Sequence, residues 1–212
     1  MIISVHIAKT GGASFLGYLN SVFGDQVYHG YFFDKEKMPQ VSIIHGHFNA
    51  YKQKQRYPEA QLITWMRDPI ERVISHYQYW QRKPDENNRD CKAIYDNRWS
   101  LSDWATQGIE SKNWVSRHTC CFDELKIEDY SFIGIKEYYE RSITLFNKIF
   151  QIDEKYTIPM KNINPNKFVN EKYNDVPQDV KNKIIENNLM DIKLYKEALI
   201  SFKKKCDQYE IE

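Results

Sequence analysis

Side chains that can hold an anion surround two adjacent glycines near the start of the chain. Lys9 offers an ammonium group, and Thr10 and Ser14 offer hydroxyl donors. Gly11 and Gly12 carry no Cβ, so the backbone between these side chains can approach a ligand closely. An ordinary tight turn is the alternative, because glycine suits both. The residue types favour a loop that cradles a phosphate or a similar anion.

Two histidines, His45 and His47, offer a different kind of chemistry. Imidazole titrates near neutrality, so either side chain could remove a proton from a hydroxyl group. In an extended strand, residues two apart point to the same side, and Gly46 leaves room between the two rings. They could also be two metal ligands, but no third ligand in the sequence obviously belongs with them. A hydrogen-bonded histidine without a chemical role is the common alternative for each one alone.

Arg67 and Ser75 form the third candidate group. A guanidinium holds a phosphate in a fixed geometry, and a serine hydroxyl donates one more hydrogen bond. Ser75 lies about two helical turns after Asp68, on nearly the same face, so both side chains could reach one anion. The alternative is that Arg67 pairs with a carboxylate and Ser75 faces solvent. Arg72 is expected to be an exposed helix residue or a salt-bridge partner.

A strand and a helix must position the glycine loop. Residues 2 to 7 form an apolar run of the kind found in buried parallel strands. From Phe15 to Phe23 apolar residues recur with helical spacing, which predicts a helix with one buried face. The unpaired N–H groups at the start of that helix would point at an anion over the loop.

Similar elements flank the other candidates. An apolar strand is predicted over residues 41–48, ending in the two histidines, and another over 62–66. The helix after the second of these has Asp68 as its N-cap, Pro69 at its first position and Glu71 to complete a capping box. Arg67 should therefore lie between a strand and a helix, as the glycines do.

The rest of the chain continues this alternation. A solvated loop is predicted over residues 82–98, and Ser100 and Asp103 form a Ser-x-x-Asp cap that starts a helix. In an Asn- and Pro-rich loop, Asn164 and Lys167 could close over a nucleotide, although an ordinary loop is the alternative. The other predicted elements are a short strand around 27–32, a strand at 131–135, and helices at about 137–150, 177–187 and 189–206. Strands alternating with helices indicate a parallel sheet with helices on both faces and a ligand at the carboxyl ends of the strands.

The overall composition is that of an ordinary folded protein. A chain of 212 residues, 42% of them hydrophobic, predicts one domain over residues 1–212. Thirty basic and 29 acidic side chains leave a net charge of +1, which disfavours a nonspecific nucleic-acid binder. There is no run long enough to span a bilayer and no signal-peptide pattern, so we expect a cytoplasmic protein. The four cysteines lack C-x-x-C spacing and are expected to be reduced, structural thiols.

Three of these motifs resemble those of sulfotransferases that use 3′-phosphoadenosine 5′-phosphosulfate (PAPS). Lys-Thr-Gly-Gly-x-Ser at 9–14 resembles their 5′-phosphosulfate loop and differs from the ATP and GTP P-loop, where Lys follows the second Gly. Arg-Asp-Pro-x-x-Arg at 67–72, followed by Ser75, resembles their 3′-phosphate motif. His-Gly-His at 45–47 is similar to the catalytic motif of the heparan sulfate 2-O-sulfotransferase family. Looser similarities follow at 113–117, 132–142 and 188–195, so the resemblance to carbohydrate and bacterial sulfotransferases spans nearly the whole chain.

The resemblance implies a P-loop-like three-layer α/β fold and the transfer of a sulfonyl group from PAPS to an acceptor hydroxyl, with 3′,5′-ADP (PAP) as product and no metal. In it, His47 is the base, His45 assists in orientation or substrate contact, and Lys9 stabilises the leaving phosphate. A polysaccharide is the expected acceptor, but a glycolipid or a small metabolite fits the same chemistry. The residues that would bind the nucleotide are Lys9, Thr10, Gly11, Gly12, Ala13, Ser14, Arg67, Ser75 and, from the similarity at 113–117, Arg117.

Two other functions remain open from the sequence. A kinase-like phosphotransferase would use ATP and Mg²⁺, and the position of Lys9 before both glycines argues against it. A noncatalytic binding module could keep the phosphate pocket without the transfer chemistry.

Overall fold

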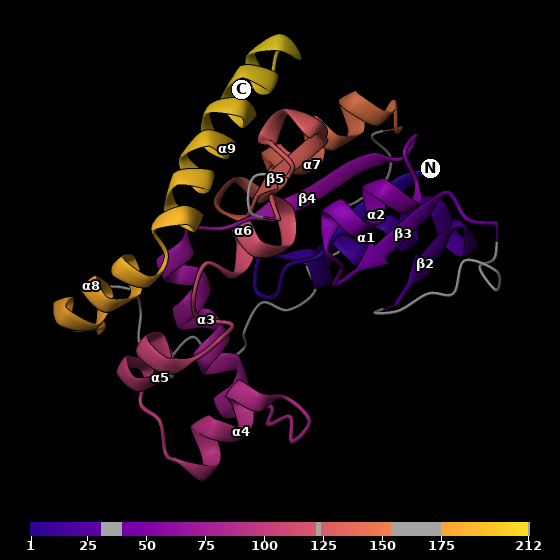
Figure 1. Ribbon diagram of the computed structural model, residues 1–212. Helices are drawn as coiled ribbons and strands as arrows, with labels where there is room; N and C mark the ends of the chain where they lie inside the picture. The colour runs from indigo at the N-terminus through magenta and orange to yellow at the C-terminus, as the bar shows by residue number, and fades with distance from the viewer. Residues whose placement is uncertain (31–39, 122–123, 154–174, 212) are drawn as a thin grey trace.

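Five parallel strands form the centre of the protein in a computed structural model that describes residues 1–30, 40–121, 124–153 and 175–211 (Figure 1). The strand order is β2-β3-β1-β4-β5, so β1 lies in the middle of the sheet. All residues of β1 and β3 are buried, as expected for parallel strands covered on both faces. The strands are β1 (Ile2–Val5), β2 (Val27–His29), β3 (Ile43–Gly46), β4 (Gln61–Met66) and β5 (Tyr130–Ile135).

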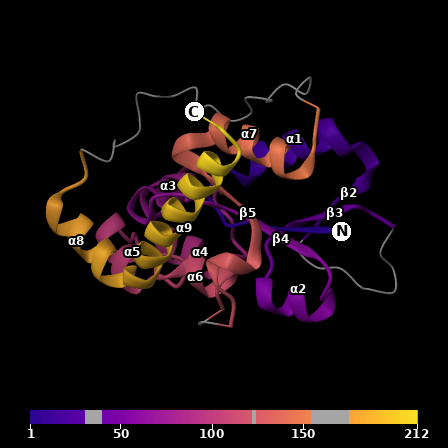
Figure 2. The same cartoon turned by 90° about the horizontal axis from the view of Figure 1, so that it is seen from above.

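Helices cover both faces of this sheet. Helices α1 (Gly12–Phe23) and α7 (Tyr139–Phe150) lie on one face, and α2 (Ala50–Arg56) and α6 (Trp114–Thr119) lie on the other (Figure 2). Phe15 of α1 packs edge-on against Phe146 of α7, with ring centroids 5.1 Å apart, and lies 5.2 Å from the ring of Trp65 in β4. The predicted three-layer α/β fold is confirmed. Strands β1 and β3 are shorter than predicted, β4 and β5 each begin one residue earlier, and α2, α4 and α6 lie where no helix was predicted.

A second cluster of buried apolar side chains lies among the helices that follow β4. It is built by α3 (Pro69–Arg82), α4 (Arg89–Asp96), α5 (Leu101–Gln107) and α8 (Gln178–Asn187), with Trp80 and Trp104 at its centre. The last helix, α9 (Leu189–Gln208), runs from this cluster back to the edge of the sheet (Figure 1). There the ammonium of Lys205 donates to the carbonyl oxygens of Tyr130 and Ser131 in β5. Single 3₁₀ turns occur at Gly24–Gln26, Ile127–Asp129 and Lys136–Tyr138.

The prediction of a solvated loop over residues 82–98 is wrong, because α4 occupies its second half. Asn88 caps this helix by accepting a hydrogen bond from the Cys91 N–H at 3.0 Å. Cys91 and Ile94 are buried, and Asp90 turns inward to accept from Trp104 Nε1 at 2.9 Å. A segment with few apolar residues is thus a helix because its acidic side chain satisfies a buried indole.

The predicted capping box at the start of α3 is only half right. Asp68 accepts from the N–H groups of Ile70 and Glu71, as an N-cap should. The Glu71 carboxylate pairs with Arg67 at 3.0 Å instead of returning to the Asp68 N–H. That N–H donates to Glu137 at 2.9 Å. Glu137, which is distant in sequence, therefore accepts the hydrogen bond from the N-cap N–H that Glu71 was predicted to accept.

Arg72 does not lie on the surface, so the first of its two predicted roles, an exposed helix residue, is wrong. Its side chain is fully buried, and Nη2 donates to the Glu110 carbonyl at 3.0 Å. Burial lowers the pKa of this guanidinium, while the charges of Asp191 and Glu110 act in the opposite direction. Arg72 therefore belongs to the interior contact between α3 and the later helices.

Residues that follow α8 fix the start of α6. The Asp191 carboxylate accepts from the N–H groups of Val115 and Ser116, at 3.1 and 2.8 Å, and Asn188 accepts from the Asn113 N–H at 2.9 Å. Two stretches about 75 residues apart in sequence are therefore joined by direct hydrogen bonds.

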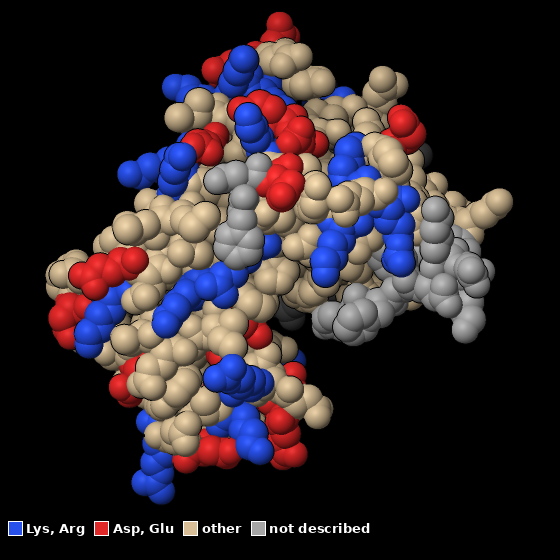
Figure 3. All heavy atoms as spheres, in the orientation of Figure 1, with Lys and Arg blue, Asp and Glu red and all other residues tan. Residues whose placement is uncertain are grey.

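The four cysteines are buried, and none of them forms a disulfide. Among the described residues, no helix combines the length and the apolar character needed to cross a bilayer. Lysine and arginine side chains are interspersed with aspartate and glutamate over the face shown in Figure 3, consistent with the nearly balanced charge of the chain.

Candidate functional site

A pocket of about 310 Å³ opens at the carboxyl ends of the central strands, beside the start of α1. It brings together the glycine loop and the Arg67 and Ser75 pair, which come from separate strand-to-helix connections. Its lining residues are His6, Ala8, Lys9, Gly11, Gly12, Ala13, Ser14, Arg67, Ser75, His76, Tyr79 and Lys136.

The glycine loop leaves the start of α1 available to an anion. Gly11 is the N-cap residue and lies in the left-handed region, with φ of 101°, a conformation that favours glycine. Among the described residues, no side chain caps the N–H groups at the start of α1, and the first turn of this helix contains no acidic residue. A Cβ on Gly12 would lie 2.0 Å from Cδ2 of His6, so only glycine fits against that ring. The helix start can therefore attract a negatively charged group.

Thr10 is the one residue of the loop that the structure does not bring into the pocket lining. Its side chain is fully buried, and its hydroxyl donates to the Ile7 carbonyl at 2.9 Å. This hydrogen bond closes the turn from within.

Lys9 is held at the pocket by an aromatic ring. Its ammonium lies 4.3 Å from the ring centroid of Tyr79, within the range of a cation–π interaction. Burial, and then the positive charges of Arg82 and Arg67, lower the pKa of Lys9 to about 8. An anion in the pocket would favour the charged ammonium and raise this pKa again.

Arg67 links the two loops that form the pocket. Its Nη2 pairs with Glu71 at 3.0 Å, and its Nη1 donates to the Lys9 carbonyl at 3.4 Å. Arg67 therefore pairs with a carboxylate, as one alternative from the sequence had it, and its side chain also lines the pocket. Ser75 lines the same pocket two turns along α3. Lys136, which follows β5, adds a third basic side chain.

The two predicted histidines both contact a third one, His6. The ring of His45 lies 5.0 Å from that of His6 and the ring of His47 lies 4.3 Å from it, both nearly parallel to it at 28°. His45 is buried, and its Nδ1 lies 2.8 Å from the Ser4 hydroxyl, which leaves no surface for a substrate. Of the three rings, His6 is the one that lines the pocket, and His47 stacks on it.

Burial sets the protonation of both predicted histidines. It lowers the pKa of His45 to about 3, with smaller contributions from His29 and His47. For His47, burial and then the charges of His118 and His29 lower the pKa to about 4, against a hydrogen bond to the backbone of His6 that raises it. Both imidazoles are therefore neutral at pH 7, so each has a nitrogen lone pair that can accept a proton.

Sequence reasoning missed five lining residues, namely His6, Ala8, His76, Tyr79 and Lys136. His6 and Lys136 directly follow β1 and β5, and the carboxyl ends of parallel strands meet at one edge of a sheet, so their positions could have been inferred. Tyr79 lies one turn after Ser75 on α3 and could have been inferred in the same way. The side-chain direction of His76 depends on its packing against Trp80, with ring centroids 4.1 Å apart, which the sequence does not reveal.

The remaining candidates lie elsewhere. Arg117 is on α6 and is not among the residues that line this pocket. Asn164 and Lys167 fall outside the described residues. Within the part of the chain that the structure describes, no three His, Cys, Asp or Glu side chains come together as metal ligands.

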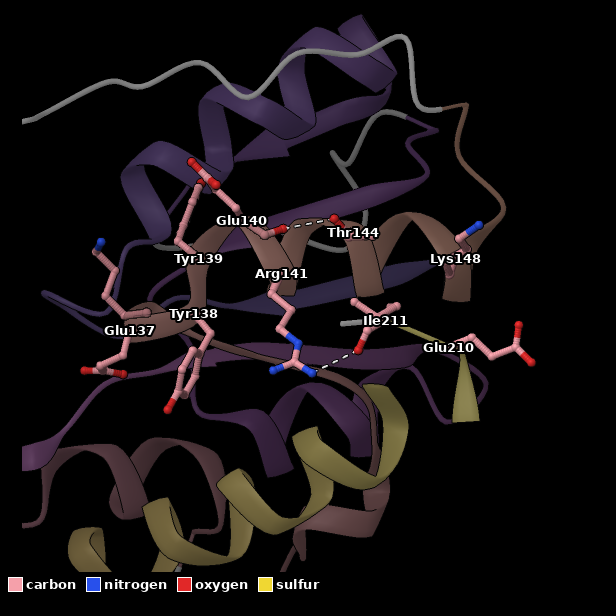
Figure 4. Close-up of a pocket in the computed structure, with 10 residues that line it drawn as sticks. Glu137, Tyr138, Tyr139, Glu140, Arg141, Thr144, Lys148, Glu210 and Ile211 are labelled. Atoms are coloured by element: carbon pink, nitrogen blue, oxygen red, sulfur yellow. Dashed lines mark hydrogen bonds between the residues drawn. The ribbon is translucent and has the colours of Figure 1, made fainter. Parts of the chain in front are cut away.

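A larger and more open pocket of about 770 Å³ lies between α7 and the end of the chain (Figure 4). Two hydrogen bonds join residues drawn there: Arg141 donates to the Ile211 carbonyl at 2.9 Å, and the Thr144 hydroxyl donates to the Glu140 carbonyl at 3.2 Å. It shares Lys136 with the smaller pocket. The smaller pocket, with the helix start and the basic side chains, is the better candidate for an anionic ligand.

The fold and the site define an α/β protein with a glycine-rich loop between the central strand and the first helix. A model described as the sulfotransferase family matches residues 1–196, so the chain belongs to this family. No curated protein sequence matches the chain. Among solved structures, mouse sulfotransferase SULT7A1 complexed with PAP is similar with a TM-score of 0.42 and 15% identity, over 72% of this chain and 59% of that one.

Proposed function

We propose that this protein transfers a sulfonyl group from PAPS to a hydroxyl group of an acceptor, and that the acceptor is a carbohydrate or a glycoconjugate. The observation that carries the proposal is that the glycine loop and the Arg67 and Ser75 pair line one pocket. A nucleotide with phosphates at both its 3′ and 5′ positions needs two such groups at a fixed separation. Membership of the sulfotransferase family supports the same chemistry.

The residues of the pocket fit the two ends of such a nucleotide. In the proposal, Lys9, Ser14 and the backbone N–H groups of residues 11–13 hold the 5′-phosphosulfate, since the helix start is uncapped. Arg67 and Ser75 hold the 3′-phosphate, and Lys136 adds a nearby positive charge. Thr10 contributes by closing the turn through its hydrogen bond to Ile7.

PAPS supplies an activated sulfonyl group, and the protein positions the groups that move the proton and stabilise the charge. His47 accepts the proton of the acceptor hydroxyl as the acceptor oxygen bonds to sulfur. The bond between sulfur and the bridging phosphate oxygen breaks, and Lys9 stabilises the negative charge that develops on that oxygen. The products are a sulfate ester, PAP and a protonated His47. A general base of this kind contributes roughly 10² to 10⁴ in rate.

The pKa of His47, about 4 in the free protein, suits this role only when the anionic nucleotide is present. A negative charge in the adjacent pocket favours the imidazolium and raises the pKa toward neutrality. His45 has no exposed surface, so in this proposal it acts by orientation and not by substrate contact.

Nucleotide binding is the first test of the proposal. In isothermal titration calorimetry, the protein should bind 3′,5′-ADP more tightly than 5′-AMP, and Arg67→Ala should remove most of this preference. Charge-assisted hydrogen bonds of roughly 1.5–3 kcal/mol correspond to about 10- to 100-fold in affinity. Glu71→Gln, which removes the carboxylate partner of Arg67, is the matched control and should retain the preference. A protein that binds ATP with Mg²⁺ but does not bind 3′,5′-ADP would instead be a phosphotransferase candidate.

Turnover is the second test. Radiolabelled PAPS offered with a panel of polysaccharides, glycolipids and small hydroxyl compounds should label one acceptor class. His47→Ala should abolish this transfer and leave 3′,5′-ADP binding nearly unchanged. Transfer at the wild-type rate in His47→Ala would remove His47 from the mechanism. Nucleotide binding without any transfer would favour a noncatalytic binding module.

A further inference from the structure

The His6 ring lies between the glycine loop and His47, and no role has yet been assigned to it. Residue 6 follows β1 directly. Its backbone N–H donates to the Gly46 carbonyl at 2.8 Å, which joins the end of β1 to the end of β3. The ring edge formed by Cδ2 and Nε2 lies over Gly12, where a Cβ would come within 2.0 Å of it. His6 also lines the pocket, and its Nδ1 is buried with no hydrogen-bond partner in the described part of the chain.

His6 contacts His47 in two ways. The two imidazole rings stack with their centroids 4.3 Å apart and their planes 28° apart. The ring of His47 also forms a hydrogen bond with the backbone of His6, and this bond raises the pKa of His47. A ring nitrogen that donates to a backbone carbonyl is fixed as the protonated one, so the other nitrogen keeps the lone pair. Residue 6 therefore fixes both the plane and the tautomer of His47.

We propose that His6 is a positioning residue for sulfonyl transfer: its stacked ring holds His47 in one orientation and excludes water from one face of it. This inference rests on the proposed function. It assigns a role to a side chain that touches both the phosphate loop and the base.

The neutral state of His6 is part of this role. The titratable groups that face it are His45, His47, His29 and Lys9, and burial together with their charges keeps the pKa of His6 well below its usual value. A neutral ring can support the imidazolium that forms on His47 when it takes the acceptor proton, whereas a protonated ring would repel it. The stack thus favours a state in which one of the two rings is an imidazolium and disfavours a state in which both are.

The test observes His47 directly and needs no acceptor. Imidazole ¹⁵N and ¹³C shifts are recorded between pH 3 and pH 8 for the wild-type protein and for His6→Ala and His6→Phe, with His47→Ala to assign the signals. In the wild-type protein, His47 should be neutral and in one tautomer from pH 5 to pH 8, with a midpoint near pH 4. In His6→Ala, water reaches the exposed face, and the midpoint should rise by roughly one pH unit or more because less of the burial penalty remains. His6→Phe keeps an aromatic face and should retain the wild-type behaviour.

Two outcomes would overturn the proposal. The first is a His6→Ala protein whose His47 shifts and titration midpoint match the wild type. The second is a folded His6→Phe protein in which His47 titrates freely, since stacking would then not be what holds it. If His6→Ala does not fold, the His6→Phe result decides alone. His29→Ala, at an exposed histidine near the same cluster, is the matched control and should change the midpoint by less than His6→Ala does.

A catalytic measurement separates this proposal from the proposed function. Once an acceptor is known, kcat at saturating PAPS should fall about 10- to 100-fold in His6→Ala, since a base displaced by about 1 Å costs on the order of 100-fold. In His6→Phe, kcat should stay within a few-fold of the wild type. A protein that transfers no sulfonyl group would refute the proposed function and leave the spectroscopic result standing. Normal transfer with a kcat unchanged by His6→Ala would refute the role of His6 alone.

Discussion

Lys9 contacts other residues of the pocket through both its side chain and its backbone. Its ammonium lies over the ring of Tyr79, and its carbonyl accepts a hydrogen bond from Arg67. Its φ of 71° is uncommon for a residue with a Cβ and directs the chain into the glycine turn. Because burial and neighbouring positive charges lower its pKa to about 8, the ammonium loses its proton at mildly alkaline pH when no anion is bound.

The affinity for 3′,5′-ADP should therefore depend on pH. An anion favours the charged form of Lys9, so binding takes up a proton above pH 8 and the affinity falls as the pH rises from 8 toward 10. A single linked proton limits the fall to about tenfold per pH unit. Calorimetry in buffers of different ionisation enthalpy would measure both the affinity and the proton uptake.

Lys9→Met should bind 3′,5′-ADP more weakly at pH 7 and lose most of this pH dependence. Lys92→Met changes an exposed lysine on α4 and serves as the control, with binding like that of the wild type. A Lys9→Met protein that keeps the full alkaline loss of affinity would show that another group is responsible.

At the scale of single elements, the start of α1 depends on Gly12. Replacing it with alanine would place a Cβ 2.0 Å from Cδ2 of His6, so the loop or the ring must move. Such overpacking typically costs about 1–3 kcal/mol, and here it would also displace the N–H groups that face the pocket. Gly12→Ala should lower both the free energy of unfolding in urea and the affinity for 3′,5′-ADP.

Gly24→Ala at the other end of α1 is the control for this change. A Cβ there would meet no atom within 4 Å, although φ is +53°. The cost should be limited to the strain of the left-handed backbone, about 1–2 kcal/mol, with nucleotide affinity unchanged. Equal losses of affinity in the two variants would contradict a local role for Gly12.

Helix α6 depends on a carboxylate supplied by α9. Asp191 accepts from the N–H groups of Val115 and Ser116, and its charge also favours the buried guanidinium of Arg72. Asp191→Ala should lower the free energy of unfolding by roughly 1–3 kcal/mol, because buried donors lose their acceptor. Asp207→Ala, at an exposed position on the same helix, should stay within about 0.5 kcal/mol of the wild type. Chemical denaturation would compare the two, and equal stabilities would refute this role for Asp191.

Local patterns predicted most of these elements, and the errors have physical causes. Asp68, Pro69 and the spacing of apolar residues identified α3, because capping and amphipathicity are local. Helix α4 was missed because Asp90 finds its partner, Trp104, 14 residues away. The same holds for Arg72, whose burial depends on a carbonyl 38 residues away. The glycine loop, Arg67 and Ser75 could be inferred as a site from strand-end motifs, but the stack on His6 depends on sheet register.

At the scale of the whole molecule, two apolar clusters surround the pocket from different sides. One underlies the sheet, and the other lies among α3, α4, α5 and α8. His76 lines the pocket and packs against Trp80 and Trp104 of the second cluster, so the packing of these helices reaches the site. We propose that both clusters belong to one cooperative domain over residues 1–212.

Trp104→Ala tests this proposal. The side chain is fully buried and donates to Asp90, so its loss should cost roughly 3–5 kcal/mol. Thermal unfolding should remain a single transition at a lower temperature, and the affinity for 3′,5′-ADP should fall. Ile109→Ala, at a position that is 38% exposed, is the control and should have a small effect. Two separate transitions, with only one of them lowered, would show that the clusters unfold independently.

The hydrogen bond from Arg67 to the Lys9 carbonyl has a consequence for ligand selection, because it joins the two phosphate-binding loops through one side chain. A phosphate bound to Arg67 also fixes the backbone of Lys9 in the glycine loop. Each phosphate should therefore increase the affinity of the protein for the other. If the two phosphate sites are coupled in this way, the two phosphates of 3′,5′-ADP together should contribute more binding free energy than the sum of the contributions measured with adenosine 3′-phosphate and with adenosine 5′-phosphate. Abundant cellular monophosphates would accordingly be poor competitors for the doubly phosphorylated ligand.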